Sequence, residues 1–72
     1  MTPDQLQNKI GQRIVELRKE KGWSQSDLAR ACKKDRQSIE RLESGKFNVK
    51  IYTLLEIANA LEISLSKLVD FK

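Results

Sequence analysis

The sequence predicts an all-α fold made of five short helices. Large apolar residues recur at spacings of three and four along most of the chain, which is the pattern of helices with one buried face. Residues that favour helix starts, and glycines that end helices, divide this pattern into short pieces. The alternation typical of strands occurs only in FNVKIY, residues 47–52, which we interpret as a loop leading into a helix.

The first predicted helix begins near the N-terminus. Thr2 can cap it and Pro3 suits its first position, while Gly22 provides a stop. Gly11 lowers the helix propensity by about 1 kcal/mol, so a later start capped by Asn8 is an alternative. Four apolar residues are predicted to form its buried face: Leu6, Ile10, Ile14 and Leu17.

The second predicted helix covers about residues 24–32. Ser24 and Asp27 have the spacing of a capping box, in which each side chain bonds to the backbone amide of the other residue. The chain has a single cysteine, which excludes an internal disulfide and favours a small buried apolar role for that residue. The residues predicted to be buried on this helix are Leu28, Ala31 and Cys32, with Ala29 beside them.

The third predicted helix, about residues 36–43 after the N-cap Asp35, has an unusually narrow apolar stripe. Its only large apolar residues are Ile39 and Leu42. At 100° of rotation per residue, Ser38 lies near the core edge. The strip that points away from the core contains Gln37, Arg41 and Ser44, flanked by Arg36 and Glu40.

Two interpretations of this polar strip are open. Glutamine and arginine form paired hydrogen bonds with adenine and guanine in the major groove of DNA, so the strip can read bases. A narrow helix also fits between the DNA backbones. Alternatively, the strip is an ordinary solvated helix face, and Arg36 and Glu40 form only a weak ion pair one turn apart.

The C-terminal third predicts two further helices. One covers about residues 50–61, and the last is a short helix capped by Ser64. The apolar stripe of the longer helix is predicted to contain Ile51, Leu54, Leu55, Ala58 and Leu61. The short helix carries Leu65, Leu68 and Val69. With no repeat or linker, the 72 residues are expected to form one domain, residues 1–72.

Composition narrows the classes of function. Histidine is absent, so catalytic dyads that need it and most transition-metal sites are excluded. We therefore expect no enzyme, no metal and no cofactor. The sequence shows neither a signal peptide nor an apolar run long enough to span a bilayer, which favours a cytoplasmic protein without a membrane partner. A net charge of +4 favours a polyanionic partner, although weakly.

Several motifs in order resemble one known family. The stretch RIVELRKEKGWSQSDLARACKKDRQSIERLESGK, followed by LLEIANALEISLSKLV, resembles the helix-turn-helix domain of the phage repressor and Cro proteins, the Xre family. The likeness covers roughly residues 8–70. It implies a lambda-repressor-like fold in which the third helix is the recognition helix. Small Cro-like repressors and the controller proteins of restriction-modification systems are similar in size.

The resemblance also implies roles for individual residues. Those expected to contact DNA bases are Arg36, Gln37, Ser38 and Arg41. Those expected to contact phosphates are Gln25, Arg30, Ser44, Lys46 and Asn48, and Gln25 would also brace the recognition helix. Arg18 and Glu43 match an ion pair that ties the first helix to the end of the third. Ala29 matches the small residue where the second and third helices approach closely.

The sequence departs from the family pattern in the turn before the recognition helix. Lys33 and Lys34 stand where glycine and an apolar residue are usual. A positive φ at Lys33 would cost about 1 kcal/mol. The aliphatic stem of Lys34 can replace the apolar residue, and both lysines can reach phosphate. Trp23 is expected in the core, and Phe47 and Tyr52 in loop and helix packing.

The function expected from the resemblance is transcriptional regulation. A homodimer would bind double-stranded DNA at a pseudo-palindromic operator through its third helices. The residues expected to form the dimer interface are Leu65, Leu68, Val69 and Phe71. The alternative is an antitoxin that binds both a toxin protein and its own promoter. A toxin and RNA polymerase are thus further candidate partners.

Overall fold

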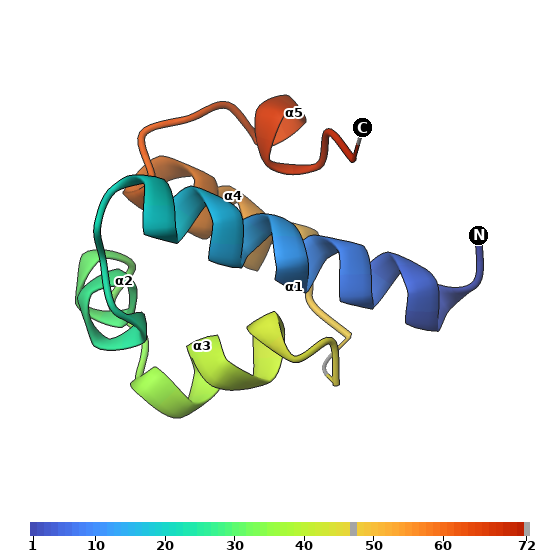
Figure 1. Cartoon of the computed structure of the whole chain (residues 1–72), viewed down its shortest axis with the longest axis horizontal. Coiled ribbons are helices and arrows are strands. Elements are labelled where there is room, and N and C mark those ends of the chain that lie inside the picture. Colours follow the sequence, from blue (N-terminus) through green and yellow to red (C-terminus); the bar gives the residue numbers. More distant parts are fainter. Residues whose placement is uncertain (47, 72) are drawn as a thin grey trace.

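The protein is a bundle of five helices, seen in a computed structural model that describes residues 1–46 and 48–71. Among those residues there is no strand, and the predicted all-α fold is confirmed. The helices, labelled in Figure 1, are α1 (Pro3–Glu20), α2 (Gln25–Ala31), α3 (Arg36–Glu43), α4 (Ile51–Ala60) and α5 (Leu65–Leu68).

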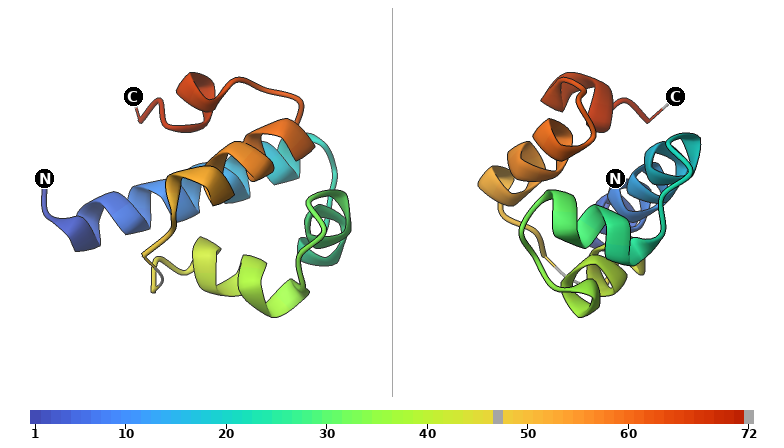
Figure 2. Two further views of the ribbon diagram at one scale, coloured as in Figure 1. Left: turned by 180° about the vertical axis from the view of Figure 1, so that it is seen from behind. Right: turned by 90° about the vertical axis from the view of Figure 1, so that its left-hand side faces the viewer.

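The long helix α1 organises the bundle. Helix α3 packs against both α1 and α2, and α5 packs against α4 and α1. As a result, α3 and α5 lie on opposite sides of α1, with α3 along one edge of the molecule (Figures 1 and 2). The first turns of α1 extend beyond the other helices. This arrangement leaves one whole side of α3 open to solvent.

Side-chain caps set most of the helix starts. Thr2 and Gln5 form a capping box at α1, and Ser24 and Asp27 form the predicted capping box at α2. The side chain of Asp35 accepts a hydrogen bond from the Ser38 amide at the start of α3. Ser64 caps α5 in the same way. Helix α4 differs, because it begins after Lys50 without a side-chain cap.

One apolar core joins all five helices. The residues buried in it are Ile10, Ile14, Leu17, Leu28, Ala29, Cys32, Ile39, Leu42, Leu54, Ile57, Ala58, Leu61 and Leu68. Trp23 packs against the edge of this core, as expected. Burial raises the pKa of the Cys32 thiol above its ordinary value, which is consistent with the predicted apolar role.

Several residues predicted to be buried are exposed instead. Leu6, near the N-terminal end of α1, is 41% exposed. In α4 the buried face turns toward Ile57, which the prediction omitted, and Ile51 and Leu55 are exposed. Tyr52, predicted to pack, is also exposed. Phe47 lies outside the described residues.

The second helix buries Leu28 and Cys32 as predicted, but its buried face differs at one edge. Ala29 is buried at its contact with α3, and Ala31, predicted to be buried, is exposed. The turn that follows, whose conformation the sequence left open, is left-handed at Lys33, with φ 59°. The Lys34 amide donates to the Ala29 carbonyl over 2.8 Å. The turn thus keeps a tight geometry with a lysine where glycine is usual.

Gly11 permits α1 to cross the end of α3 closely. A Cβ atom at this position would meet the Glu43 carbonyl oxygen and would lie 2.7 Å from the Leu42 carbonyl oxygen. Only glycine leaves room for those backbone atoms. The residue that weakened the helix prediction is therefore required by packing, and α1 is continuous through it.

No helix within the described residues is both long enough and apolar enough to cross a lipid bilayer.

Candidate nucleic-acid interface

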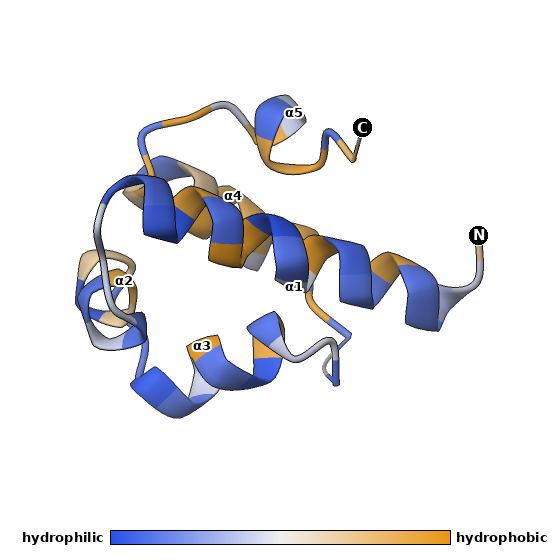
Figure 3. Ribbon diagram, in the orientation of Figure 1, coloured by the Kyte–Doolittle hydropathy of each residue, from blue (hydrophilic) through white to orange (hydrophobic). Residues whose placement is uncertain are grey.

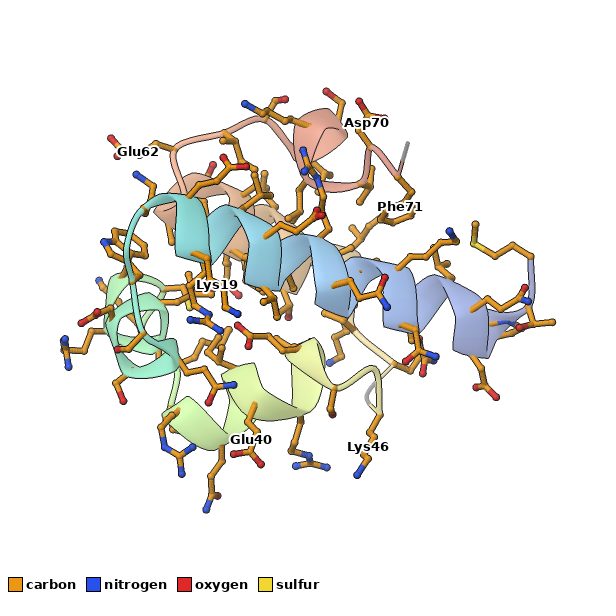
Figure 4. The ribbon with its side chains drawn as sticks, viewed as in Figure 1. Lys19, Glu40, Lys46, Glu62, Asp70 and Phe71 are labelled. Carbon is orange, nitrogen blue, oxygen red and sulfur yellow. The ribbon has the colours of Figure 1, made fainter. Side chains whose placement is uncertain are left out.

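Helix α3 is attached to the protein along one narrow line. Ile39 and Leu42 are buried, whereas Arg36, Gln37, Glu40 and Arg41 are exposed. Figure 3 shows α3 as a mostly hydrophilic helix with little orange along it. In Figure 4, Glu40 points away from the body of the molecule at the same edge as Lys46. The predicted polar strip is thus open to a partner along its length.

A buried ionic network fixes the C-terminal end of α3. The Arg18 guanidinium donates through Nε to Glu43 Oε2 over 2.7 Å and through Nη2 to Glu43 Oε1 over 3.0 Å. Its third bond, over 2.8 Å, goes to the carbonyl of Trp23. The side chains of Arg18 and Glu43 are only 10% and 5% exposed. The pair expected from the resemblance therefore forms, and it is shielded from water.

Gln25 joins this network from the start of α2. Its Nε2 donates to Glu43 Oε1 over 3.0 Å. The Glu43 carboxylate, on α3, thus accepts hydrogen bonds from both α1 and α2. The arrangement fits the bracing role expected of Gln25. Because a primary amide has a second N–H and a carbonyl oxygen, this bond leaves Gln25 with further hydrogen-bonding capacity.

Two of the arginines expected to contact DNA form ion pairs with carboxylates on their own helices. Arg36 Nη1 lies 3.0 Å from Glu40 Oε2, one turn along α3, and both side chains are about half exposed. Arg30 pairs with Asp27 on α2. The Arg36–Glu40 pair predicted by the alternative interpretation, in which the strip is an ordinary solvated helix face, is therefore present. Such exposed pairs contribute about 1 kcal/mol or less, so a phosphate or a base can replace the carboxylate.

The loop after α3 presents the remaining residues expected at phosphates. Ser44, Lys46 and Asn48 are exposed. The Ser44 hydroxyl donates to the Arg41 carbonyl over 2.9 Å and so closes the end of the helix. Gly45 turns the chain with φ 75° and packs against Asn8 of α1. The loop is thereby held beside the exposed strip.

A basic pocket of about 270 Å³ lies between α3 and the start of α4. Its lining comprises Lys34, Ser38, Arg41, Leu42, Asn48, Lys50 and Thr53. Sequence reasoning missed Lys50 and Thr53 as members of the candidate interface. The sequence signal that could have identified this part of the interface is Lys50, which occupies an N-cap position where a side-chain acceptor is usual.

An apolar groove of about 320 Å³ lies on the neighbouring side. Among the described residues, none that lines it is charged; its lining comprises Pro3, Leu6, Gln7, Ile10, Asn48, Val49, Ile51, Leu54, Leu65 and Val69. Of the residues predicted to form a dimer interface, Leu65 and Val69 line this groove. Leu68 is fully buried in the core, so its assignment to an interface is corrected. Phe71 lies at a different hollow, beside Arg13.

The described residues contain no group of three or more histidine, cysteine or acidic side chains able to hold a metal ion. The chemistry that the site does offer is hydrogen bonding and positive charge. The hydrogen-bonding groups and the positive charges lie on the exposed side of α3 and in the shallow basic pocket. Such an arrangement suits the edges of bases and the phosphates of a DNA backbone.

A short helix held against a preceding helix, with its polar side exposed, defines a helix-turn-helix DNA-binding protein. The model of the helix-turn-helix family HTH_3 matches residues 14–68. The chain belongs to this family of DNA-binding transcriptional regulators.

Known proteins similar to the chain carry matching descriptions. The uncharacterized HTH-type transcriptional regulator y4dJ of Sinorhizobium fredii is 35% identical over 60 residues, which are 83% of this chain and 78% of that protein. A hypothetical transcription factor of Neisseria meningitidis is 35% identical over 48 residues, 67% of this chain and 45% of that protein. The chain thus spans less than half of the second relative.

Among solved structures, the chain is similar to the restriction-modification controller protein C.AhdI from Aeromonas hydrophila. The identity is 40% and the TM-score 0.83, over 86% of this chain and 94% of that one. This likeness extends over nearly all of C.AhdI. The fold of this chain is therefore shared with that solved structure.

Proposed function

We propose that the protein is a sequence-specific transcriptional regulator that binds a pseudo-palindromic operator as a homodimer, with residues 1–72 acting as one DNA-binding domain. The observation that carries this proposal is the exposed polar side of α3, held in place by the buried network of Arg18, Glu43 and Gln25. A rigid support matters because base reading requires side chains to be positioned accurately before they meet the DNA.

The strip on α3 has the chemistry for direct reading of bases. Gln37 can bond to both polar groups of adenine, and Arg41 can do the same with guanine. Arg36 and Ser38 flank these two on α3. Arg30, Ser44, Lys46 and Asn48 border the strip from α2 and from the following loop, where phosphates would lie. The net charge of +4 favours the encounter with DNA.

The apolar groove supports a second copy of the chain as the partner. Two recognition helices of a dimer enter successive major grooves about 34 Å apart, so the dimer surface must border the DNA-facing surface. Asn48 lines both the groove and the basic pocket, which puts the two surfaces side by side. The neighbouring residues Ile51, Tyr52 and Leu55 are exposed apolar side chains of α4. The proposed interface therefore includes α4 as well as Leu65 and Val69.

The names of the similar proteins favour regulation over the alternative of a toxin-binding antitoxin. They describe transcriptional regulators and a controller protein. A toxin and RNA polymerase stay predicted partners on the sequence alone. The proposal includes no catalysis, since a binding surface suffices for the function. It places the protein in the cytoplasm, where a bacterial operator would be accessible.

Selection of bound duplexes from random DNA tests the proposal. We expect a consensus of two inverted half-sites whose centres lie about ten base pairs, or a multiple of that, apart. Binding without any preferred sequence would contradict a sequence-specific regulator. A single unrepeated half-site would contradict the homodimer while leaving base reading by α3 intact. Light scattering of the free protein supplies the independent measure, with twice 8.3 kDa expected.

A further inference from the structure

Lys34 lines the basic pocket and already forms an ion pair. Its Nζ is 2.9 Å from Oε1 of Glu56 on α4, and the two side chains are 26% and 32% exposed. This hydrogen bond raises the pKa of Lys34, because it favours the charged ammonium. Lys34 thus lines the pocket while paired with Glu56, which does not line it.

The remainder of the pocket attracts an anion. Lys50 and Arg41 line it together with Lys34, and no acidic residue does. The first turn of α4 opens at Lys50 without a side-chain cap, and Thr53 from that turn also lines the pocket. Backbone amides at a helix start carry partial positive charge and bind phosphate groups well. The charges and the helix start thus converge on one hollow beside the α3 strip.

We propose that this pocket receives a backbone phosphate of the DNA and that Glu56 competes with that phosphate for Lys34. The inference rests on the DNA binding proposed above. It assigns Glu56 as a positioning residue that never contacts DNA yet limits how strongly the protein binds to any duplex. Lys34, at the position of the family's usual apolar residue, would be the phosphate contact that Glu56 limits.

The competition has a measurable electrostatic consequence. Lys34 and Glu56 approach DNA as a neutral pair, so the pair displaces few condensed counterions from the backbone. When Glu56 is neutral, Lys34 brings a full positive charge to the phosphate. The slope of log affinity against log salt should then steepen by about 0.9 for each half-site. The affinity should rise as well, because the partly buried ion pair no longer has to be broken.

The experiment compares Glu56→Gln with a matched control, Glu62→Gln. Glu62 also pairs with a lysine, Lys21, over 3.0 Å. It lies at the opposite end of the molecule from Glu40 and Lys46 (Figure 4), so its charge is largely screened from bound DNA. Affinities are measured for operator and scrambled duplexes at several salt concentrations. We expect Glu56→Gln to raise affinity for both duplexes about two- to fivefold per half-site, and Glu62→Gln to change it little.

A double variant shows whether Lys34 transmits the effect. In a Lys34→Gln background, Glu56→Gln should change neither the affinity nor the salt slope. Equal effects of Glu56→Gln and Glu62→Gln, or an effect that persists without Lys34, would overturn the inference. Thermal unfolding of each variant shows that the folded protein is being compared. Failure of the unaltered protein to bind any duplex would instead contradict the proposed function itself.

Discussion

Arg18 and Glu43 form a two-bond ion pair that joins α1 to the end of α3, with N–O distances of 2.7 and 3.0 Å. Because both side chains are nearly buried, removing one leaves the other charge without adequate solvation. We expect Arg18→Ala to lower the free energy of unfolding by about 3 kcal/mol. Urea unfolding of the single and double variants measures this destabilisation and the coupling between the residues.

The exposed pair Arg36–Glu40 is the control for that cycle. Its N–O distance is 3.0 Å, but its side chains are 52% and 58% exposed. A solvated pair of this kind should show a coupling energy below about 1 kcal/mol. Similar coupling energies for the buried and the exposed pair would mean that burial adds nothing to the Arg18–Glu43 interaction.

Gly11 should be intolerant of the smallest possible side chain. Alanine has the higher helix propensity by about 1 kcal/mol, so Gly11→Ala would stabilise an open site in α1. Here the added Cβ meets backbone carbonyls of Leu42 and Glu43, which cannot rotate away. We expect a net destabilisation of about 1–3 kcal/mol, measured by urea unfolding.

The neighbouring exposed position supplies the control for Gly11. Gln12→Ala leaves an alanine one residue later on α1, at a position that is exposed to solvent. Its effect on stability should stay within about 0.5 kcal/mol. If Gly11→Ala were as harmless as Gln12→Ala, the close crossing of α1 and α3 would be contradicted.

The number of helices and their starts could be predicted from local sequence. The capping boxes at Thr2 and Ser24 and the N-caps at Asp35 and Ser64 depend on residues within one turn, so spacing alone identifies them. The recognition helix could be located for the same reason. Its narrow apolar stripe contains only Ile39 and Leu42, which leaves a single way to dock it.

The buried face of α4 could not be predicted in the same way. Apolar residues surround much of this helix, so periodicity permits more than one face to be buried. The positions of α2 and α5 select Leu54, Ile57 and Ala58 and leave Leu55 exposed. The buried face of α4 is therefore determined by tertiary packing. The requirement for glycine at position 11 also depends on another helix, and neither the basic pocket nor the apolar groove exists within a single segment.

The start of α3 should make stability depend on pH in the acid range. The backbone hydrogen bond from Ser38 lowers the pKa of Asp35 below its ordinary value of 3.8. A carboxyl group with a lowered pKa stabilises the fold above its unfolded-state pKa, and this contribution is lost as pH falls through the lower folded-state value. Unfolding by urea at pH values from about 5 to 2 should therefore show stability declining with acid.

Asparagine separates the titration of Asp35 from its capping. Asp35→Asn keeps an oxygen that accepts the hydrogen bond from the Ser38 amide but cannot ionise. The stability difference between the unaltered protein and this variant should shrink as pH falls below 3.8. Asp27 titrates equally in both proteins and cancels in the comparison. A difference that does not vary with pH would show that the Asp35 charge has no part in stability.

The proposed dimer surface can be tested at Ile51, which is 74% exposed and lines the apolar groove. Ile51→Lys adds a charge that a second copy would have to bury, so the variant should be monomeric by light scattering. Asn59→Lys, on the same helix but outside the groove, should remain dimeric. A monomeric unaltered protein at tens of micromolar, or a dimeric Ile51→Lys variant, would contradict this interface.

Gln37 and Lys46 allow base reading to be separated from backbone contact. If Gln37 reads a base edge, Gln37→Ala should cost about 1–3 kcal/mol on the operator and relax the preference at one base position per half-site. Its effect on a scrambled duplex should be small, because the amide carries no charge. If Lys46 contacts phosphate, Lys46→Ala should weaken operator and scrambled duplexes alike. The salt slope should then fall by about 0.9 for each phosphate that the variant no longer neutralises.

The matched controls for this pair are Gln12→Ala and Lys67→Ala, which remove the same side chains from exposed positions on α1 and α5. Helix α5 lies on the opposite side of α1 from the recognition helix, and Gln12 lines a hollow with Asp70 and Phe71, which follow α5. Both controls should therefore leave DNA affinity and salt slope nearly unchanged. Equal weakening of both duplexes by Gln37→Ala would contradict base reading. An unchanged salt slope in Lys46→Ala would contradict its phosphate contact. Because the two outcomes are measured on the same duplexes, either assignment can fail while DNA binding by the protein stands.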